Sequence, residues 1–304
     1  MQPYNSKTLD IRYIKSLIAL LDDPDANVFT TVAEKIIKEG NEVIPILENI
    51  WEKSSDTLLQ SRIEDIIDSI QYNYLAKEFQ EWAKSPEMDL LQGAILVAKI
   101  QYPDLNSKPI DDEVERIRRD VWLELNNSLT ALEKVKIINH VLFTLHGYKA
   151  DTTNFFAPKN YFINTLIETK KGGPIILSIF YAIIAQKLGL PIYCINLPHN
   201  FVLAFKDRYF QKNFDNPMEE KRSVLFYIDP FNHGTLFSAK EIELFLRQQK
   251  IDDALSYYLP CSNKEAILQL IYNSSVALQR SNRHNKAIIF NKIHNLLAGI
   301  GNAQ

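Results

Sequence analysis

Cysteine is scarce in this chain of 304 residues, where Cys194 and Cys261 are the only two. They do not form a C-x-x-C pair, which excludes a disulfide framework and argues against structural zinc. The six histidines are scattered, and His284 and His294 lack the i, i+4 spacing of a helical metal pair. We therefore expect no metal and no cofactor.

The chain also lacks a dominant charge and a long apolar run. It has 34 Lys and Arg against 37 Asp and Glu, and no basic run of the kind that follows phosphates. No apolar stretch reaches 18 residues, and the start has no basic region followed by an apolar one. Nucleic acids and membranes are therefore not expected as partners, and we expect a soluble, cytoplasmic protein.

The residues that are present predict helices for the first third of the chain. Apolar residues follow helical spacing from Leu9 to about Leu105, and the breaks between them carry Asp, Gly, Ser and Pro. The stretch LIALLDDPDANVFTTVAEKIIKEGNEVIPILENIW resembles one HEAT-type helical hairpin. Residues 1–108 are thus predicted to form a HEAT-like helical region, and an irregular helical bundle remains the alternative.

The remainder predicts an α+β arrangement. Two amphipathic helices are expected at 111–127 and 129–145, followed by β-branched and aromatic runs near 192–205 and 224–231. The motifs SAKE and SNKE are capping boxes that open helices near 239–249 and 263–279, and a last helix is expected at 284–298. This pattern divides the rest of the chain into a core, 109–250, and C-terminal helices, 251–304.

Two stretches in this part are FFAPKNYFINTLIETKKGGPIILSIFYAIIAQKLGLPIYCINLPHNFVLAF and YIDPFNHGTLFSAKEIELFL. They resemble the transglutaminase-like superfamily, and specifically its SirB-type branch with a degenerate catalytic core. The resemblance implies a transglutaminase- or papain-like α+β core with a small antiparallel sheet. Relatives of this branch often carry helical repeats after the core, so a tetratricopeptide-like remnant is one interpretation of residues 251–304.

Active members of the superfamily carry a Cys at the start of a helix, a His on the next strand and an Asp on the following strand. A helix N-terminus and a nearby imidazole stabilise the thiolate, which is why the nucleophile stands there. The resemblance places the nucleophile between Pro174 and Ile176, with Ile176 as the preferred register. It places Asn200 at the His position and retains Asp229. An isoleucine cannot attack a substrate, and a neutral amide cannot accept a proton.

Relocated chemistry is the alternative. Cys194 and His199 lie close in sequence and, with Asp229, would make a cysteine hydrolase or acyltransferase. However, Cys194 is expected in the middle of a strand, and free cysteines are usually buried. Ser178 is a second hydroxyl or thiol candidate, but the sequence supplies no base for it.

These observations predict a non-catalytic interaction, scaffold or regulatory module whose partner is a protein or peptide. A degenerate active-site cleft can still bind an extended peptide, while the sequence does not specify an oligomeric state. The residues expected to line the cleft are Asn154, Tyr161, Asn164, Pro174, Ser178, His199, Asn200 and Asp229.

Overall fold

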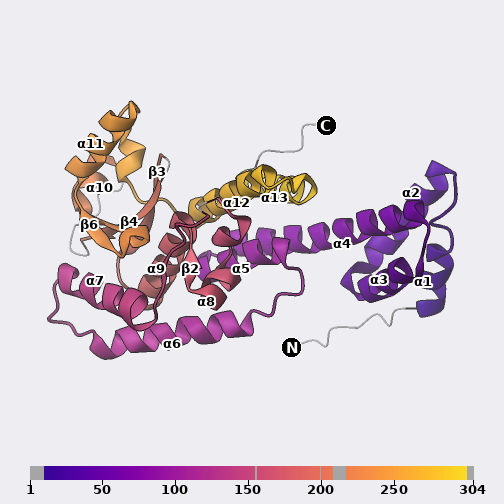
Figure 1. Cartoon of the computed structure of the whole chain (residues 1–304), viewed down its shortest axis with the longest axis horizontal. Helices are drawn as coiled ribbons and strands as arrows, with labels where there is room; N and C mark the ends of the chain where they lie inside the picture. Colours follow the sequence, from indigo (N-terminus) through magenta and orange to yellow (C-terminus); the bar gives the residue numbers. More distant parts are fainter. Residues whose placement is uncertain (1–9, 155, 199, 208–216, 300–304) are drawn as a thin grey trace. The chain divides into compact units, whose positions relative to one another are not determined.

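A computed structural model describes residues 10–154, 156–198, 200–207 and 217–299 and divides the chain into two compact units, Met1–Glu78 and Phe79–Gln304 (Figure 1). Helices predominate and the strands form small sheets, so the α+β prediction is confirmed. In the described ranges no helix combines the length and apolarity needed to cross a membrane.

The first unit is entirely helical in its described part. Its elements are α1 (Ile11–Ile18), α2 (Ala26–Glu39), the 3-10 helix η1 (Gly40–Val43), α3 (Ile44–Lys53) and the first part of α4 (Thr57–Lys84). Asp10 and Asp25 cap the first two helices by accepting hydrogen bonds from free N–H groups of the first turn. Gly40 is the residue that ends α2.

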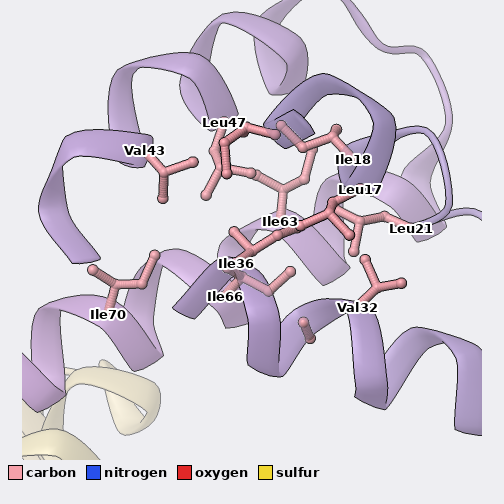
Figure 2. Packing of buried hydrophobic residues seen from close by; sticks show 12 residues of the cluster. Leu17, Ile18, Leu21, Val32, Ile36, Val43, Leu47, Ile63, Ile66 and Ile70 are labelled. Carbon is pink, nitrogen blue, oxygen red and sulfur yellow. The ribbon is translucent and has the colours of Figure 1, made fainter. Parts of the chain in front are cut away.

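One hydrophobic cluster holds these helices together, with side chains from α1, α2, α3 and α4 pointing into a common centre (Figure 2). Ile14, Ile36 and Leu47 are completely buried in it. Arg62 on α4 fixes the turn between α1 and α2, because its guanidinium donates to the carbonyl oxygens of Leu21 and Asp23 at 2.6 and 2.8 Å. The four helices thus form one unit, while the HEAT-like assignment stays a prediction.

The second unit begins at Phe79, within α4, and contains most of the helices. They are α5 (Leu90–Gln101), α6 (Lys108–Glu124), α7 (Ala131–Asn139), the π-helical turn η2 (His140–Leu145), η3 (Pro158–Tyr161), α8 (Ile163–Thr169), α9 (Pro174–Lys187), α10 (Pro217–Ser223), η4 (Pro230–Asn232), α11 (Ala239–Gln249), η5 (Leu255–Tyr258), α12 (Asn263–Arg280) and α13 (His284–Ala298). α5 is apolar nearly all round and contacts α8, α9 and α12. It therefore packs inside this unit, although the sequence grouped it with residues 1–108.

Four antiparallel strands form the larger sheet of the second unit. They are β3 (Ile192–Leu197), β4 (Asn200–Lys206), β5 (Val224–Asp229) and β6 (Thr235–Phe237), which pair in that order. The five inner residues of β4 are all buried, because α9 covers one face of the strand and a cluster including Ile242, Leu246 and Tyr258 covers the other. The predicted small antiparallel sheet is confirmed.

A second, two-stranded sheet leads into α9. β1 (Lys149–Ala150) pairs in parallel with β2 (Lys171–Gly172), which directly precedes the helix. At Gly173 the backbone N–H donates to the carbonyl oxygen of Asn160 at 3.0 Å. A Cβ at Gly173 would lie 3.1 Å from that oxygen, so the close approach favours glycine. These contacts fix the point at which α9 begins.

Candidate functional site

A pocket of about 480 Å³ lies at the start of α9 in the second unit. It is formed by the segment around η3, the first turn of α9, the adjoining ends of β3 and β4, and one face of α12. The described lining residues are Phe156, Tyr161, Pro174, Ile175, Asn196, Leu197, Asn200, Phe201, Gln269, Tyr272, Asn273, Val276, Ala277 and Arg280. Its size is in the range of ligand-binding pockets.

The first turn of α9 brings Pro174 and Ile175 to the pocket wall. Proline suits this position because its missing N–H would have no acceptor in the helix. Gly173, the cap residue, has no side chain to accept from the next N–H groups. The electropositive start of the helix therefore faces the pocket, and the side chains that it contributes there, Pro174 and Ile175, are apolar.

α12 supplies the opposite wall as one stripe along the helix. Its lining residues are Gln269, Tyr272, Asn273, Val276, Ala277 and Arg280, which follow i, i+3, i+4, i+7, i+8 and i+11 spacing. Residues at this spacing share a helix face. Asn273 donates from Nδ2 to the carbonyl oxygen of Gln269 at 2.8 Å, which fixes its carboxamide. The sequence analysis missed this wall, although a polar stripe within an otherwise apolar helix pattern was a usable signal.

Arg280 is the only charged residue among the described residues of the lining. Its guanidinium carbon lies 4.5 Å from the ring centre of Phe156, a cation–π contact. Burial raises the pKa of the Tyr161 phenol, and the positive charge of Arg280 partly counteracts this increase. The pocket therefore has a positive potential at the end formed by these three side chains.

The three positions that the superfamily resemblance assigns to the triad lie in different environments. Asn200 lines the pocket, and its Oδ1 accepts from the backbone N–H of Phe201 at 2.8 Å. Ile176 is completely buried and is not in the described lining, whereas its neighbour Ile175 is. Asp229, at the end of β5, is 8% exposed and also lies outside the described lining.

The carboxylate of Asp229 serves the turn after β5. Oδ1 accepts from the backbone N–H groups of Phe231 and Asn232 at 3.0 and 3.3 Å, and Oδ2 accepts from Nδ2 of Asn232 at 2.6 Å. These bonds cap the short helix η4. Both carboxylate oxygens are thus engaged in holding the local backbone.

The other nucleophile candidates are buried in the core. Ser178 is completely buried, and its Oγ donates to the carbonyl oxygen of Phe201 at 2.7 Å. Cys194 is 2% exposed in the middle of β3. Burial raises the pKa of the Cys194 thiol well above its ordinary value, and the proximity of Cys261 adds to the increase. Its proposed partner His199 lies outside the described residues.

The Asn-containing segment before α9 contributes one lining residue, Tyr161. Asn154 is exposed, and its carbonyl oxygen accepts from Nδ2 of Asn160 at 2.8 Å. Asn164 lies on α8, where its buried Oδ1 has no hydrogen-bond partner among the described residues. Of the eight predicted cleft residues, the described lining therefore contains Tyr161, Pro174 and Asn200.

The described lining of the pocket contains no carboxylate, imidazole or thiol. Over the parts of the chain that are described, no group of three or more His, Cys, Asp or Glu side chains is arranged to hold a metal ion. The carboxamides and the guanidinium of the pocket are hydrogen-bonding groups, and guanidinium cannot act as a metal ligand at neutral pH. The arrangement supports ligand recognition more directly than metal-assisted chemistry.

Sequence comparisons find relatives of this chain among known proteins. A UPF0162 protein of Xylella fastidiosa strain 9a5c is 24% identical over 206 residues, which cover 66% of this chain and 68% of that protein. A UPF0162 protein of Vibrio cholerae is 23% identical over 159 residues, or 52% of this chain and 54% of the relative.

The resemblance extends to a eukaryotic protein over a shorter range. F-box only protein 21 of Mus musculus is 27% identical over 111 residues, which are 36% of this chain and 17% of that protein. No solved structure matches the chain. The family model described as the transglutaminase-like superfamily matches residues 108–272, more than half of the chain. The chain therefore belongs to the transglutaminase-like superfamily.

Proposed function

We propose that this protein is a non-catalytic member of the superfamily's SirB-type branch and acts as an interaction or scaffold module. Its pocket at the start of α9 binds an extended peptide segment of a partner without making or breaking a covalent bond. The degenerate active site thus serves as a recognition site, and the partner is a protein or peptide.

The observation that carries this proposal is the side-chain chemistry at the start of α9. Pro174 and Ile175 line the pocket where the superfamily resemblance predicts a nucleophile. Among the described lining residues there is no Cys, Ser, Thr, Lys or His. Covalent catalysis requires a nucleophile and an adjacent base, and the described lining holds no base beside the phenols of Tyr161 and Tyr272.

The remaining triad positions support the same conclusion. Asn200 offers a carboxamide, which is neutral at physiological pH and cannot act as a general base. The Asp229 carboxylate is occupied by three hydrogen bonds to the turn that follows it. An orienting carboxylate acts by holding an imidazole, whereas these bonds give Asp229 a structural role.

The polar groups of the pocket suit a peptide. Asn196, Asn200, Gln269 and Asn273 all line it. Each carboxamide has a donor and an acceptor, as a peptide group has, so it can hydrogen-bond an extended main chain. Apolar side chains between them provide contact area. The pocket therefore combines hydrogen-bonding and apolar surface in the manner of a binding site.

The relocated-cysteine enzyme is less well supported. A thiolate is the reactive form of cysteine, and burial of Cys194 favours the neutral thiol. We expect native protein at pH 7 to react with iodoacetamide at Cys194 at least about 100-fold more slowly than the urea-unfolded chain. Peptide mapping by mass spectrometry gives the rate at Cys194 itself. Fast stoichiometric labelling in the native state would favour the enzyme.

The proposal as a whole is tested by assaying purified full-length protein for amidase, peptidase and acyl-transfer turnover beside two variants, Asp229→Asn and Cys194→Ser. We expect no turnover above the uncatalysed rate in any of the three. Turnover by the wild-type protein that is lost in a variant retaining native circular dichroism would overturn the non-catalytic assignment.

A further inference from the structure

We propose that the pocket recognises a carboxylate on its peptide ligand, and that Arg280 binds this group. This inference rests on the proposed function, because it assigns the ligand chemistry of the same pocket. A peptide carboxylate has two sources, the free C-terminus of a chain and the side chain of Asp or Glu. The proposal concerns the chemistry that both share.

The charge of the lining is the first argument. No Asp or Glu is among the described residues of the pocket, and Arg280 is the sole cation there. None of the ion pairs between described residues includes Arg280. Its charge at the pocket is therefore not neutralised by a neighbouring carboxylate of the described chain, and an anionic ligand would be electrostatically favoured.

The position of the guanidinium is the second argument. The guanidinium carbon of Arg280 lies 4.5 Å from the ring centre of Phe156, so the aromatic ring supports the guanidinium group at this end of the pocket. Such a group can donate two parallel hydrogen bonds to a carboxylate. Arg280 is exposed. It can therefore bind a ligand without first breaking a buried ion pair within the protein.

The polar groups along α12 give the third argument. Asn273 and Gln269 lie two and three turns before Arg280 on the same face of the helix. A peptide whose carboxylate is held by Arg280 would therefore extend along α12 towards these carboxamides and the end of β4, where Asn200 lies. The stripe thereby defines both an anchor and a direction for the ligand.

The test measures binding of full-length protein to a fluorescent panel of mixed-sequence hexapeptides, each made in three forms. One form has neutral side chains and a free C-terminus, the second has an amidated C-terminus and one internal Glu, and the third is amidated with Gln in place of Glu. We expect one or both acidic forms to bind about 10- to 100-fold more tightly than the neutral form, as for a charge-assisted hydrogen bond.

Variants assign this preference to Arg280. Arg280→Gln should bind all three forms as weakly as the wild type binds the neutral form, and Arg280→Lys should retain part of the preference because it keeps the charge. Arg247→Gln is the matched control, since Arg247 is exposed on α11 and outside the described lining. Circular dichroism and thermal melting verify that each variant folds.

The outcomes separate the two proposals. Preference for the free C-terminus alone identifies a chain end as the source, preference for Glu alone identifies a side chain, and either supports the inference if Arg280→Gln abolishes it. Equal binding of all three forms, or a preference that survives in Arg280→Gln, overturns the carboxylate inference while peptide binding stands. Failure of the wild type to bind any form overturns the peptide-binding function and this inference with it.

Discussion

Replacing Glu113 with glutamine tests what holds the segment that leads into the pocket. Glu113 on α6 accepts hydrogen bonds from Arg116, from the Tyr148 hydroxyl at 3.1 Å and from Lys170. Lys170 ends α8 and directly precedes β2, and thereby the start of α9. The carboxylate thus ties α6 to the chain segment that positions Pro174.

The pKa of Glu113 gives the size of the stability loss expected for Glu113→Gln. Burial alone would raise it, but the hydrogen bonds from Arg116 and Lys170, the charge of Lys170 and the Tyr148 hydroxyl lower it from 4.5 to about 2. Each pKa unit between folded and unfolded states is worth about 1.4 kcal/mol, so the carboxylate contributes up to about 3 kcal/mol. Because the Arg116 side chain is 54% exposed, solvent screens part of this, and we expect Glu113→Gln to cost about 2 kcal/mol at pH 7.

The same pKa predicts a dependence on pH. Because the folded-state pKa lies below the unfolded one, the stabilisation is fully present above about pH 5 and is lost as the pH falls towards 2. The difference in unfolding free energy between wild type and Glu113→Gln should therefore be constant between about pH 6 and pH 8. It should shrink below about pH 4.5.

Urea unfolding followed by tryptophan fluorescence measures this difference. Trp51→Phe serves as the background, because the two remaining tryptophans, Trp82 and Trp122, both belong to the second unit. Glu115→Gln is the matched control: Glu115 lies on the same helix and pairs with Arg118, but its side chain is 45% exposed. We expect it to cost less than about 1 kcal/mol. Equal losses in the two variants, or a Glu113 effect that does not change with pH, would refute the reasoning.

Two further pairs of variants test the close packing at Gly234 and the register of α9. Gly234→Ala should lower the free energy of unfolding in urea by about 1–3 kcal/mol more than Gly147→Ala. Both glycines have a positive φ, so the strain of the backbone is similar in the two variants. A Cβ at Gly234 would lie 2.1 Å from the Asn139 carboxamide, whereas the space at Gly147 is open. Ile175→Cys should react with iodoacetamide at least about tenfold faster than Ile176→Cys, because Ile175 borders the pocket with 4% of its surface exposed, whereas Ile176 is completely buried. Equal stability losses in the first pair, or equal labelling in the second, would contradict these assignments.

The parts of the fold that the sequence predicts best are those with local signals. Ser238 with Glu241 and Ser262 with Glu265 form the expected capping boxes, and α11 and α12 begin where they predict. Gly299 ends α13 in a left-handed conformation, as its position suggests. Each of these signals involves residues within one turn of each other, so no knowledge of distant contacts is required.

The candidate site is harder to predict because its walls are distant in sequence. Asn200 and Pro174 follow from the superfamily resemblance, whereas Arg280 belongs to a helix that the sequence analysis interpreted as a C-terminal addition. That helix, α12, contacts α9 and β3 through tertiary packing. The periodicity of apolar residues within α12 does not reveal these partners. The same reason explains α5, whose apolar pattern indicates burial without indicating which partners bury it.

The pocket and its surroundings favour recognition over catalysis for a reason beyond the missing thiol. Placing a cysteine at Ile175, the isoleucine of this turn that lines the pocket, and a histidine at Asn200 would still leave the Asp229 carboxylate bound to the turn after β5. Releasing it would remove the cap of η4 and so cost stability. The groups that remain available to a ligand, the carboxamides and Arg280, are instead concentrated along α12 and at the adjoining strand ends. Triad chemistry of the superfamily kind would therefore require several coordinated changes, which agrees with the binding function that we propose.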